Sequence, residues 1–199
     1  QLDVFNENNN FLHNSNLYPL KFVTFSTSMQ IAHDLDLISK CLHQRSEQSP
    51  VAFRETLKCA DKFATRLLSK AKDNGLLFKK AVAVTYFQKS YEVRIIPYVP
   101  VALIGLPFEA VKHEQDSSAN CPKTLPEEML ALPHEVGHYI FRNGVFEQKG
   151  NDGVIQSVTP LHAKLMNLIP VSAPWMRNWT EELFADVFGG VYEGERMAQ

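Results

Sequence analysis

The chain contains 199 residues, of which 45 % are hydrophobic and 11 % aromatic, and its formal net charge is −2. This is enough apolar material for one domain with a sizeable core, or for one domain with a subdomain. A near-neutral charge without basic runs argues against nucleic acid as a partner. No apolar run approaches the roughly 20 residues that a membrane-spanning helix needs, so no transmembrane segment is expected.

The first part of the chain is expected to be mainly helical. Residues 1–20 are Asn-rich and expected to be irregular, and residues 21–25 could form a short strand. Apolar residues at helical spacing predict a helix at residues 28–43. A second helix is predicted to begin at Ser49-Pro50, with Ser49 as N-cap, and to stop at Asn74-Gly75.

The pattern then changes to runs that are rich in β-branched and aromatic residues. Residues 81–87 and 91–96 are expected to form a hairpin, because only a short polar interruption separates them. Residues 99–106 are a further candidate strand, which its flanking prolines would confine to an edge or an extended loop. Residues 112–124 are expected to be an exposed loop.

The last part returns to helical patterns. A helix is expected to begin at Pro126 or Pro133 and to end at Asn143-Gly144. Residues 145–157 are expected to be a loop and residues 160–169 a short helix. A final helix is expected to begin at Pro174.

This order of helices, strands and helices predicts an α+β fold. Residues 1–76 would form an N-terminal, mainly helical region and residues 77–199 the second region. The two regions are expected to share one compact domain.

The sequence His134-Glu135-Val136-Gly137-His138 is an H-E-x-x-H motif. On a helix, positions i and i+4 lie on one face, so both histidines can reach a single metal ion. Glu135 lies one step around the helix, where it can act on a water without binding the metal. The neighbouring residues are largely apolar, and burying such a polar set among them without a partner would be costly. The motif therefore predicts a metal site.

Catalytic zinc takes three protein ligands and keeps a fourth position for water. Glu182 and Asp186 stand at i and i+4 within an apolar segment near the C-terminal end of the chain. Glu182 is the predicted third ligand, and Asp186 is predicted to accept the outer N–H of a ligating histidine.

These two patterns resemble those of the gluzincin clan of zinc metallopeptidases, the thermolysin-like group, which carry H-E-x-x-H on one helix and E-x-x-x-D on the next. His134, Glu135, His138, Glu182 and Asp186 match position by position. The resemblance implies a zincin-like domain with N-terminal helices, a small mixed or antiparallel sheet, an active-site helix and a C-terminal ligand helix. It also implies one zinc ion per chain and a peptide or protein substrate.

Three other ligand assignments stay open at this stage. Glu181 could replace Glu182, although it would face about 100° away. Asp186 could bind the metal directly, as in aspzincins, but the lead-in of that family is missing. Cys121 could supply a thiolate, as in peptide deformylase, without that family's flanking residues.

Few residues follow Asp186, so the lobe that carries a transition-state histidine in thermolysin-like enzymes is expected to be absent. Tyr139, His162 and Tyr192 are the candidates for stabilising the transition state instead, although aromatic residues on helices usually pack. Residues 99–106, as an edge strand, could hold an extended peptide by strand addition.

Peptide hydrolysis with Glu135 as general base is the favoured function. The alternatives are a zinc-binding scaffold without turnover and a zinc hydrolase that acts on another substrate. No signal-peptide pattern is present, and the odd number of cysteines is not typical of a disulfide framework, so a cytoplasmic location is favoured over secretion. Cys41 and Cys59 are expected to be core residues. The glycosylation sequon at Asn178-Trp-Thr180 is interpreted as chance.

Overall fold

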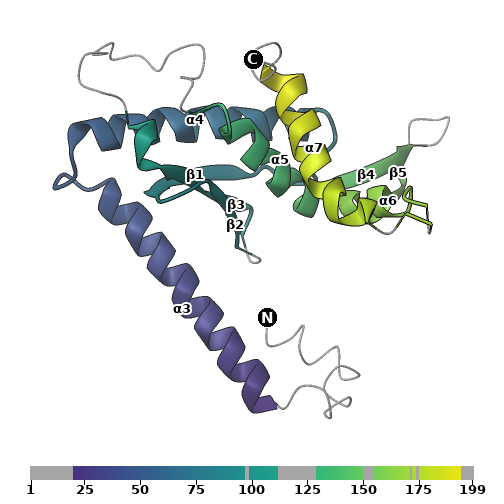
Figure 1. The fold of residues 1–199 in the computed structure, drawn as a ribbon, viewed down its shortest axis with the longest axis horizontal. Helices are drawn as coiled ribbons and strands as arrows, with labels where there is room; N and C mark the ends of the chain where they lie inside the picture. The colour runs from purple at the N-terminus through teal and green to yellow at the C-terminus, as the bar shows by residue number, and fades with distance from the viewer. Residues whose placement is uncertain are drawn as a thin grey trace. The chain divides into compact units, whose positions relative to one another are not determined.

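A computed structural model describes residues 20–96, 99–111, 129–149, 155–170, 172–173 and 175–193 (Figure 1). The chain divides into two compact units, Gln1–Leu42 and His43–Gln199. This division lies well before the boundary at residue 76 that the sequence suggested. Several expectations lie outside the described residues, namely those for residues 1–19, the loop at 112–124, Cys121, Pro126 and Pro174.

The first unit contains most of helix α3 (Leu20–Gln44). The expected helix at 28–43 is therefore confirmed, but the expected strand at 21–25 is wrong. Phe22, Phe25 and Met29 are spaced by three and four residues, so they continue the helical repeat rather than the two-residue repeat of a strand.

In the second unit, helix α4 (Val51–Asp73) has the predicted extent. Its N-cap is Pro50 rather than Ser49, whose hydroxyl donates to the carbonyl of His43 at 2.8 Å. The helix ends at Asn74, and Gly75 takes the positive φ of 75° that favours glycine.

A three-stranded sheet lies against α4. It consists of β1 (Val82–Gln88), β2 (Glu92–Ile95) and β3 (Val101–Pro107), in the order β1-β3-β2. β3 pairs parallel with β1 and antiparallel with β2, so the sheet is mixed and the expected hairpin is wrong. β3 is the central strand and not an edge. Five consecutive residues of β3 are buried, which means that both of its faces are covered.

Side chains cover the outer edge of β1. Successive outward backbone N–H groups of this strand donate to a threonine hydroxyl, a carboxylate and a side-chain amide. The pairs are Ala83 with Thr65 at 3.1 Å, Thr85 with Asp61 at 2.6 Å, and Phe87 with Gln44 at 2.7 Å. These bonds satisfy the groups that an exposed edge strand would offer to another chain. β2 forms the opposite edge of the sheet.

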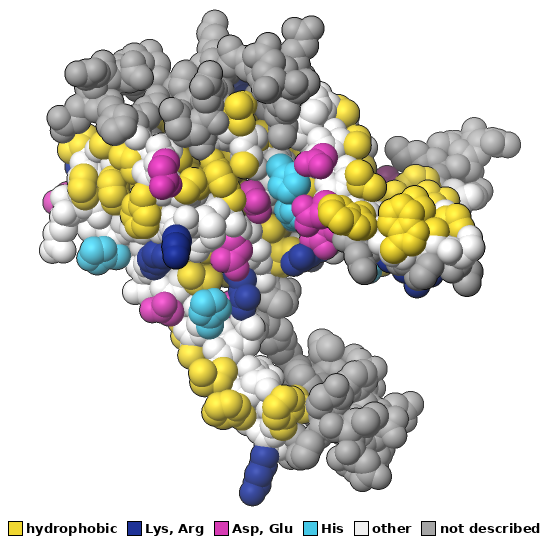
Figure 2. Space-filling model, viewed as in Figure 1, with side chains coloured by type: hydrophobic (Ala, Val, Ile, Leu, Met, Phe, Trp, Pro, Cys, Tyr) yellow, Lys and Arg dark blue, Asp and Glu magenta, His cyan; other side chains and the backbone are white. Residues whose placement is uncertain are grey.

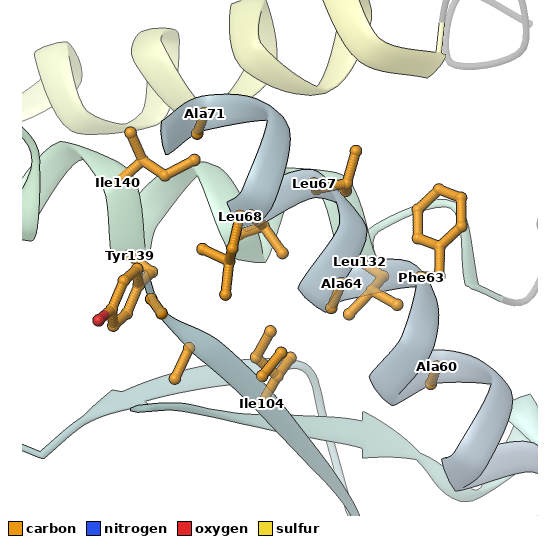
Figure 3. Packing of buried hydrophobic residues seen from close by; sticks show 14 of the residues in the cluster. Ala60, Phe63, Ala64, Leu67, Leu68, Ala71, Ile104, Leu132, Tyr139 and Ile140 are labelled. Atoms are coloured by element: carbon orange, nitrogen blue, oxygen red, sulfur yellow. The ribbon is translucent and has the colours of Figure 1, made fainter. Parts of the chain in front are cut away.

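The short helix η1 (Phe108–Ala110) follows β3. Helix α5 (Leu132–Asn143) begins with Pro133 in its first turn, which confirms that start, and it ends before Gly144 as predicted. The buried core joins α4, the sheet and α5, and Figure 3 shows Leu68, Ile104, Leu132 and Ile140 converging between them.

The C-terminal part forms a layer beside α5. Residues 145–157 were expected to be a loop, but β4 (Val145–Lys149) and β5 (Ile155–Pro160) pair as an antiparallel hairpin. Helix α6 (Leu161–Met166) confirms the short helix, and α7 (Met176–Glu193) is the predicted final helix. The fold is α+β, as expected. Among the described helices, none has the length and apolarity needed to cross a bilayer.

The cysteines differ from expectation. Cys59 takes part in a disulfide, whereas Cys41 is free and buried. The assignment of Cys59 as a simple core residue is therefore wrong, and the cysteine pattern gives no support to a cytoplasmic location.

Candidate metal centre

Helices α5 and α7 pack against each other at unusually short range. A Cβ atom on Gly137 would lie 2.7 Å from the Cα of Ala185, closer than side chains tolerate. Gly137 faces α7 from the turn between His134 and His138, and Ala185 lies between Glu182 and Asp186. This contact brings the two polar patterns, which lie far apart in the sequence, opposite each other (Figure 1).

The structure brings His134, His138 and Glu182 together at this contact. The two Nε2 atoms lie 3.0 Å apart, and Oε2 of Glu182 lies 3.4 Å from Nε2 of His134 and 3.6 Å from Nε2 of His138. One ligand atom from each residue thus lies within 4.8 Å of the other two. A tetrahedral zinc ion with bonds of about 2.0–2.2 Å requires separations of about 3.3–3.6 Å between ligand atoms. The two separations from Glu182 lie within this range and the 3.0 Å between the two Nε2 atoms is shorter, so the donor set could hold a single ion of this size once the two rings move slightly apart.

The outer nitrogens of both histidines face carboxylates. Nδ1 of His134 lies 2.8 Å from Oδ1 of Asp186, and Nδ1 of His138 lies 2.9 Å from Oε1 of Glu181. An ionised carboxylate only accepts, so each Nδ1 carries a proton, and each Nε2 presents a lone pair when its ring is neutral. Two lone pairs at 3.0 Å and a carboxylate oxygen repel one another unless a cation lies between them. Glu182 is too far from either Nε2 for a good hydrogen bond, whereas the 3.0 Å between the two Nε2 atoms suits a proton shared by the rings as well as a metal ion bound by them.

The structure separates the alternative ligands from the centre. Asp186 and Glu181 each occupy the outer side of a histidine, where a carboxylate fixes the orientation of the ring. Glu181 also accepts from Nε of Arg142 at 2.7 Å, which balances its charge. Cys121 lies outside the described residues.

Glu135 is 9 % exposed and lies among buried apolar residues of α5. Burial raises the pKa of this carboxyl above its ordinary 4.5, and the positive charge that His138 and His134 can carry opposes the shift. Glu182 and Glu92 of β2 raise the pKa further through like charge. A buried carboxyl with a raised pKa beside metal-binding groups is typical of a general base.

Comparisons of the chain with known protein families, with characterised proteins and with solved structures find no match. The chemistry of the centre therefore has to be argued from its own residues.

The structure does not bring Tyr192 to the centre. It lies about 15 Å along α7 from Glu182, and its hydroxyl accepts from the amide of Asn74 at 2.7 Å. Tyr139 is buried in the core, as Figure 3 shows, and burial raises its pKa. His162 of α6 is exposed, and its ring lies 6.4 Å from that of Phe141.

Sequence reasoning missed the roles of Glu181, Arg142 and Gly137. The role of Glu181 could have been predicted. Each metal-binding histidine usually donates its outer N–H to an acceptor, and only one acceptor, Asp186, was assigned for the two histidines. Arg142 stands four residues after His138, on the same face of α5. The close helix contact at Gly137 also had a sequence signal. Gly137 lies between the two histidines and the small Ala185 lies between Glu182 and Asp186, and two small residues at such positions allow two helices to approach closely.

Replacing Gly137 by Ala is expected to force α5 and α7 apart. The new Cβ meets backbone rather than a flexible side chain, so the free energy of unfolding of the metal-free protein should fall by about 1–3 kcal/mol. Zinc binding should weaken too, because the third ligand moves with α7. Urea denaturation and a zinc titration measure the two effects.

Gly190→Ala is the matched control on α7. Nothing lies within 4 Å of a Cβ at this position. Alanine in an exposed helix should then stabilise by up to about 1 kcal/mol. Equal effects of the two substitutions would contradict the close contact at Gly137.

Proposed function

We propose that this protein is a zinc-dependent peptidase. The observation that carries the proposal is the convergence of His134, His138 and Glu182, with a separate carboxylate on the outer nitrogen of each histidine. Among the described residues these three donors have no fourth protein partner, and three protein ligands are the pattern of catalytic zinc sites.

Glu135 would serve as the general base. When bound, zinc supplies Lewis acidity, which acidifies a coordinated water and polarises a carbonyl. Glu135 takes the proton from the attacking water and passes it to the leaving nitrogen. Asp186 and Glu181 hold the imidazoles of His134 and His138 in the tautomer that directs Nε2 toward the ion.

The substrate would lie as an extended peptide along the edge of the sheet that no other described strand pairs with. That edge is β2, because β3 is central and side chains cover β1. β2 contacts α5, and Glu92 at its start acts electrostatically on Glu135. Strand addition at β2 would place the peptide backbone beside the metal-binding face of α5.

A zinc-binding scaffold without turnover is the competing function. A scaffold has no use for a buried carboxyl beside the metal, and burying Glu135 costs stability. The same ligands could also hydrolyse a different carbonyl substrate. A peptide bond is favoured because the free β-strand edge beside the centre suits an extended backbone.

The test is a measurement of bound metal together with peptide hydrolysis. The purified protein should contain one zinc ion per chain and cleave a mixture of unstructured peptides. A chelator should abolish cleavage, and added zinc should restore it. Protein that binds no zinc would disprove the metal centre, and zinc-loaded protein without hydrolysis of any peptide would favour the scaffold.

A further inference from the structure

Helix α7 and the residue just before it carry a row of exposed apolar side chains beside the proposed metal centre. Its members, which we call the apolar row, are spaced four residues apart and are all at least 55 % exposed: Trp175, Trp179, Leu183, Val187 and Val191. In Figure 2, hydrophobic side chains over α7 and α6 lie next to the histidine and acidic side chains of the centre. Exposed apolar surface of this extent marks a binding site on most proteins.

The N-terminal half of the row adjoins the metal-binding carboxylates. Trp179 stands three residues before Glu182, and Leu183 stands three residues before Asp186, so each pair has Cβ atoms about 5–6 Å apart. The row turns by about 40° at each step, because four residues advance a helix by about 400°. Val191 therefore faces about 180° away from Glu182, whereas Trp179 faces about 60° away.

β2 and α7 flank the metal-binding face of α5 on opposite sides. Glu135, which interacts with Glu92 of β2, lies about 100° around α5 from His134, and Gly137, which contacts α7, lies about 60° from it in the other direction. A peptide that pairs with β2 across the centre thus meets the apolar row on the far side. Trp175 extends the row about 12 Å beyond Leu183, too far for a residue at the cleaved bond to reach.

The geometry points to Trp175, Trp179 and Leu183 as a docking surface for an apolar segment of the polypeptide substrate, away from the bond that is cleaved. This inference rests on the proposed peptidase function and narrows its substrate class to polypeptides long enough to reach both places. The occupant is a substrate segment because Trp179 and Leu183 adjoin the carboxylates of the centre, on the side of α5 opposite to β2.

The chain's two tryptophans both lie in this surface, so their fluorescence reports on its occupation. The experiment uses zinc-loaded Glu135→Gln protein, which should cleave about 10²- to 10⁴-fold more slowly than the native chain, and a peptide with a leucine-rich segment. We expect this peptide to shift the tryptophan emission to shorter wavelength, and the same peptide with serines for leucines to leave it unchanged. Leu183→Asp should weaken binding at least about tenfold, and the control Val191→Asp should change it less than about twofold. Leu183→Ser replaces Leu183→Asp if the latter does not bind zinc as the native chain does.

Several results would overturn the inference. These are no shift with the leucine-rich peptide, an equal shift with the serine peptide, or equal effects of the substitutions at Leu183 and Val191. A shift that appears only with phosphatidylcholine vesicles, or only at higher protein concentration, would assign the surface to lipid or to a second copy of the chain. Peptide docking without any hydrolysis by the native protein would disprove the function alone, and hydrolysis without docking would disprove this inference alone.

Discussion

Glu135→Gln is expected to reduce peptide hydrolysis by about 10²- to 10⁴-fold, because it removes the group that accepts the proton of the attacking water. Zinc content should stay at one ion per chain, since Glu135 is not among the three converging residues. Metal analysis and kcat measured on one preparation check both parts. Glu109→Gln, at an exposed glutamate in η1, is the control and should keep full activity. Full activity in the Glu135 variant would remove this residue from the mechanism.

The same substitution has an expected effect on stability. Because burial raises the pKa of Glu135 above 4.5 in the folded chain, the folded metal-free protein holds this proton more tightly than the unfolded chain does. Its contribution to stability is complete below pH 4.5 and is lost as the pH rises through the folded pKa. Metal-free Glu135→Gln protein should therefore be more stable than native at neutral pH and similar to it below pH 4.5. Urea denaturation at the two pH values in the presence of a chelator measures this difference, and a native advantage at neutral pH would contradict it.

Glu182→Ala is expected to weaken zinc binding more than about 100-fold, because it removes one of the three proposed ligands that the described residues bring together. Glu181→Ala should cost about 10–100-fold, the usual effect of losing a carboxylate that orients a ligating histidine. Competition with a chelator of known affinity gives both dissociation constants. The two residues are adjacent and chemically identical, so the pair is its own matched control. A larger loss from Glu181→Ala than from Glu182→Ala would reverse the ligand assignment.

The candidate centre could be predicted in large part because its two halves are local. The spacing of His134 and His138, and that of Glu182 and Asp186, depends only on the helical repeat, and both segments form helices. Helical periodicity likewise placed α4, which lies within a few residues of its expected limits.

Long-range contacts decided the rest. The order β1-β3-β2 could not be inferred from the sequence. Two strands joined by a short turn can pair directly as a hairpin, or they can lie on either side of a third strand that comes later in the chain. The pairing of β3 with both β1 and β2 settles this choice, and a local sequence pattern does not specify that pairing. The open edge beside the centre therefore belongs to β2 instead of residues 99–106.

By itself, the sequence determined which side chains share a helical face, since a repeat of 3.6 residues is a property of the local backbone. Only the tertiary structure decided which faces meet. The contact of Gly137 with Ala185 sets Glu182 against the Nε2 atoms and Glu181 against the outer nitrogen of His138. Glu181 and Glu182 are neighbours in the chain, and the packing of α7 on α5 alone distinguishes their positions in the centre.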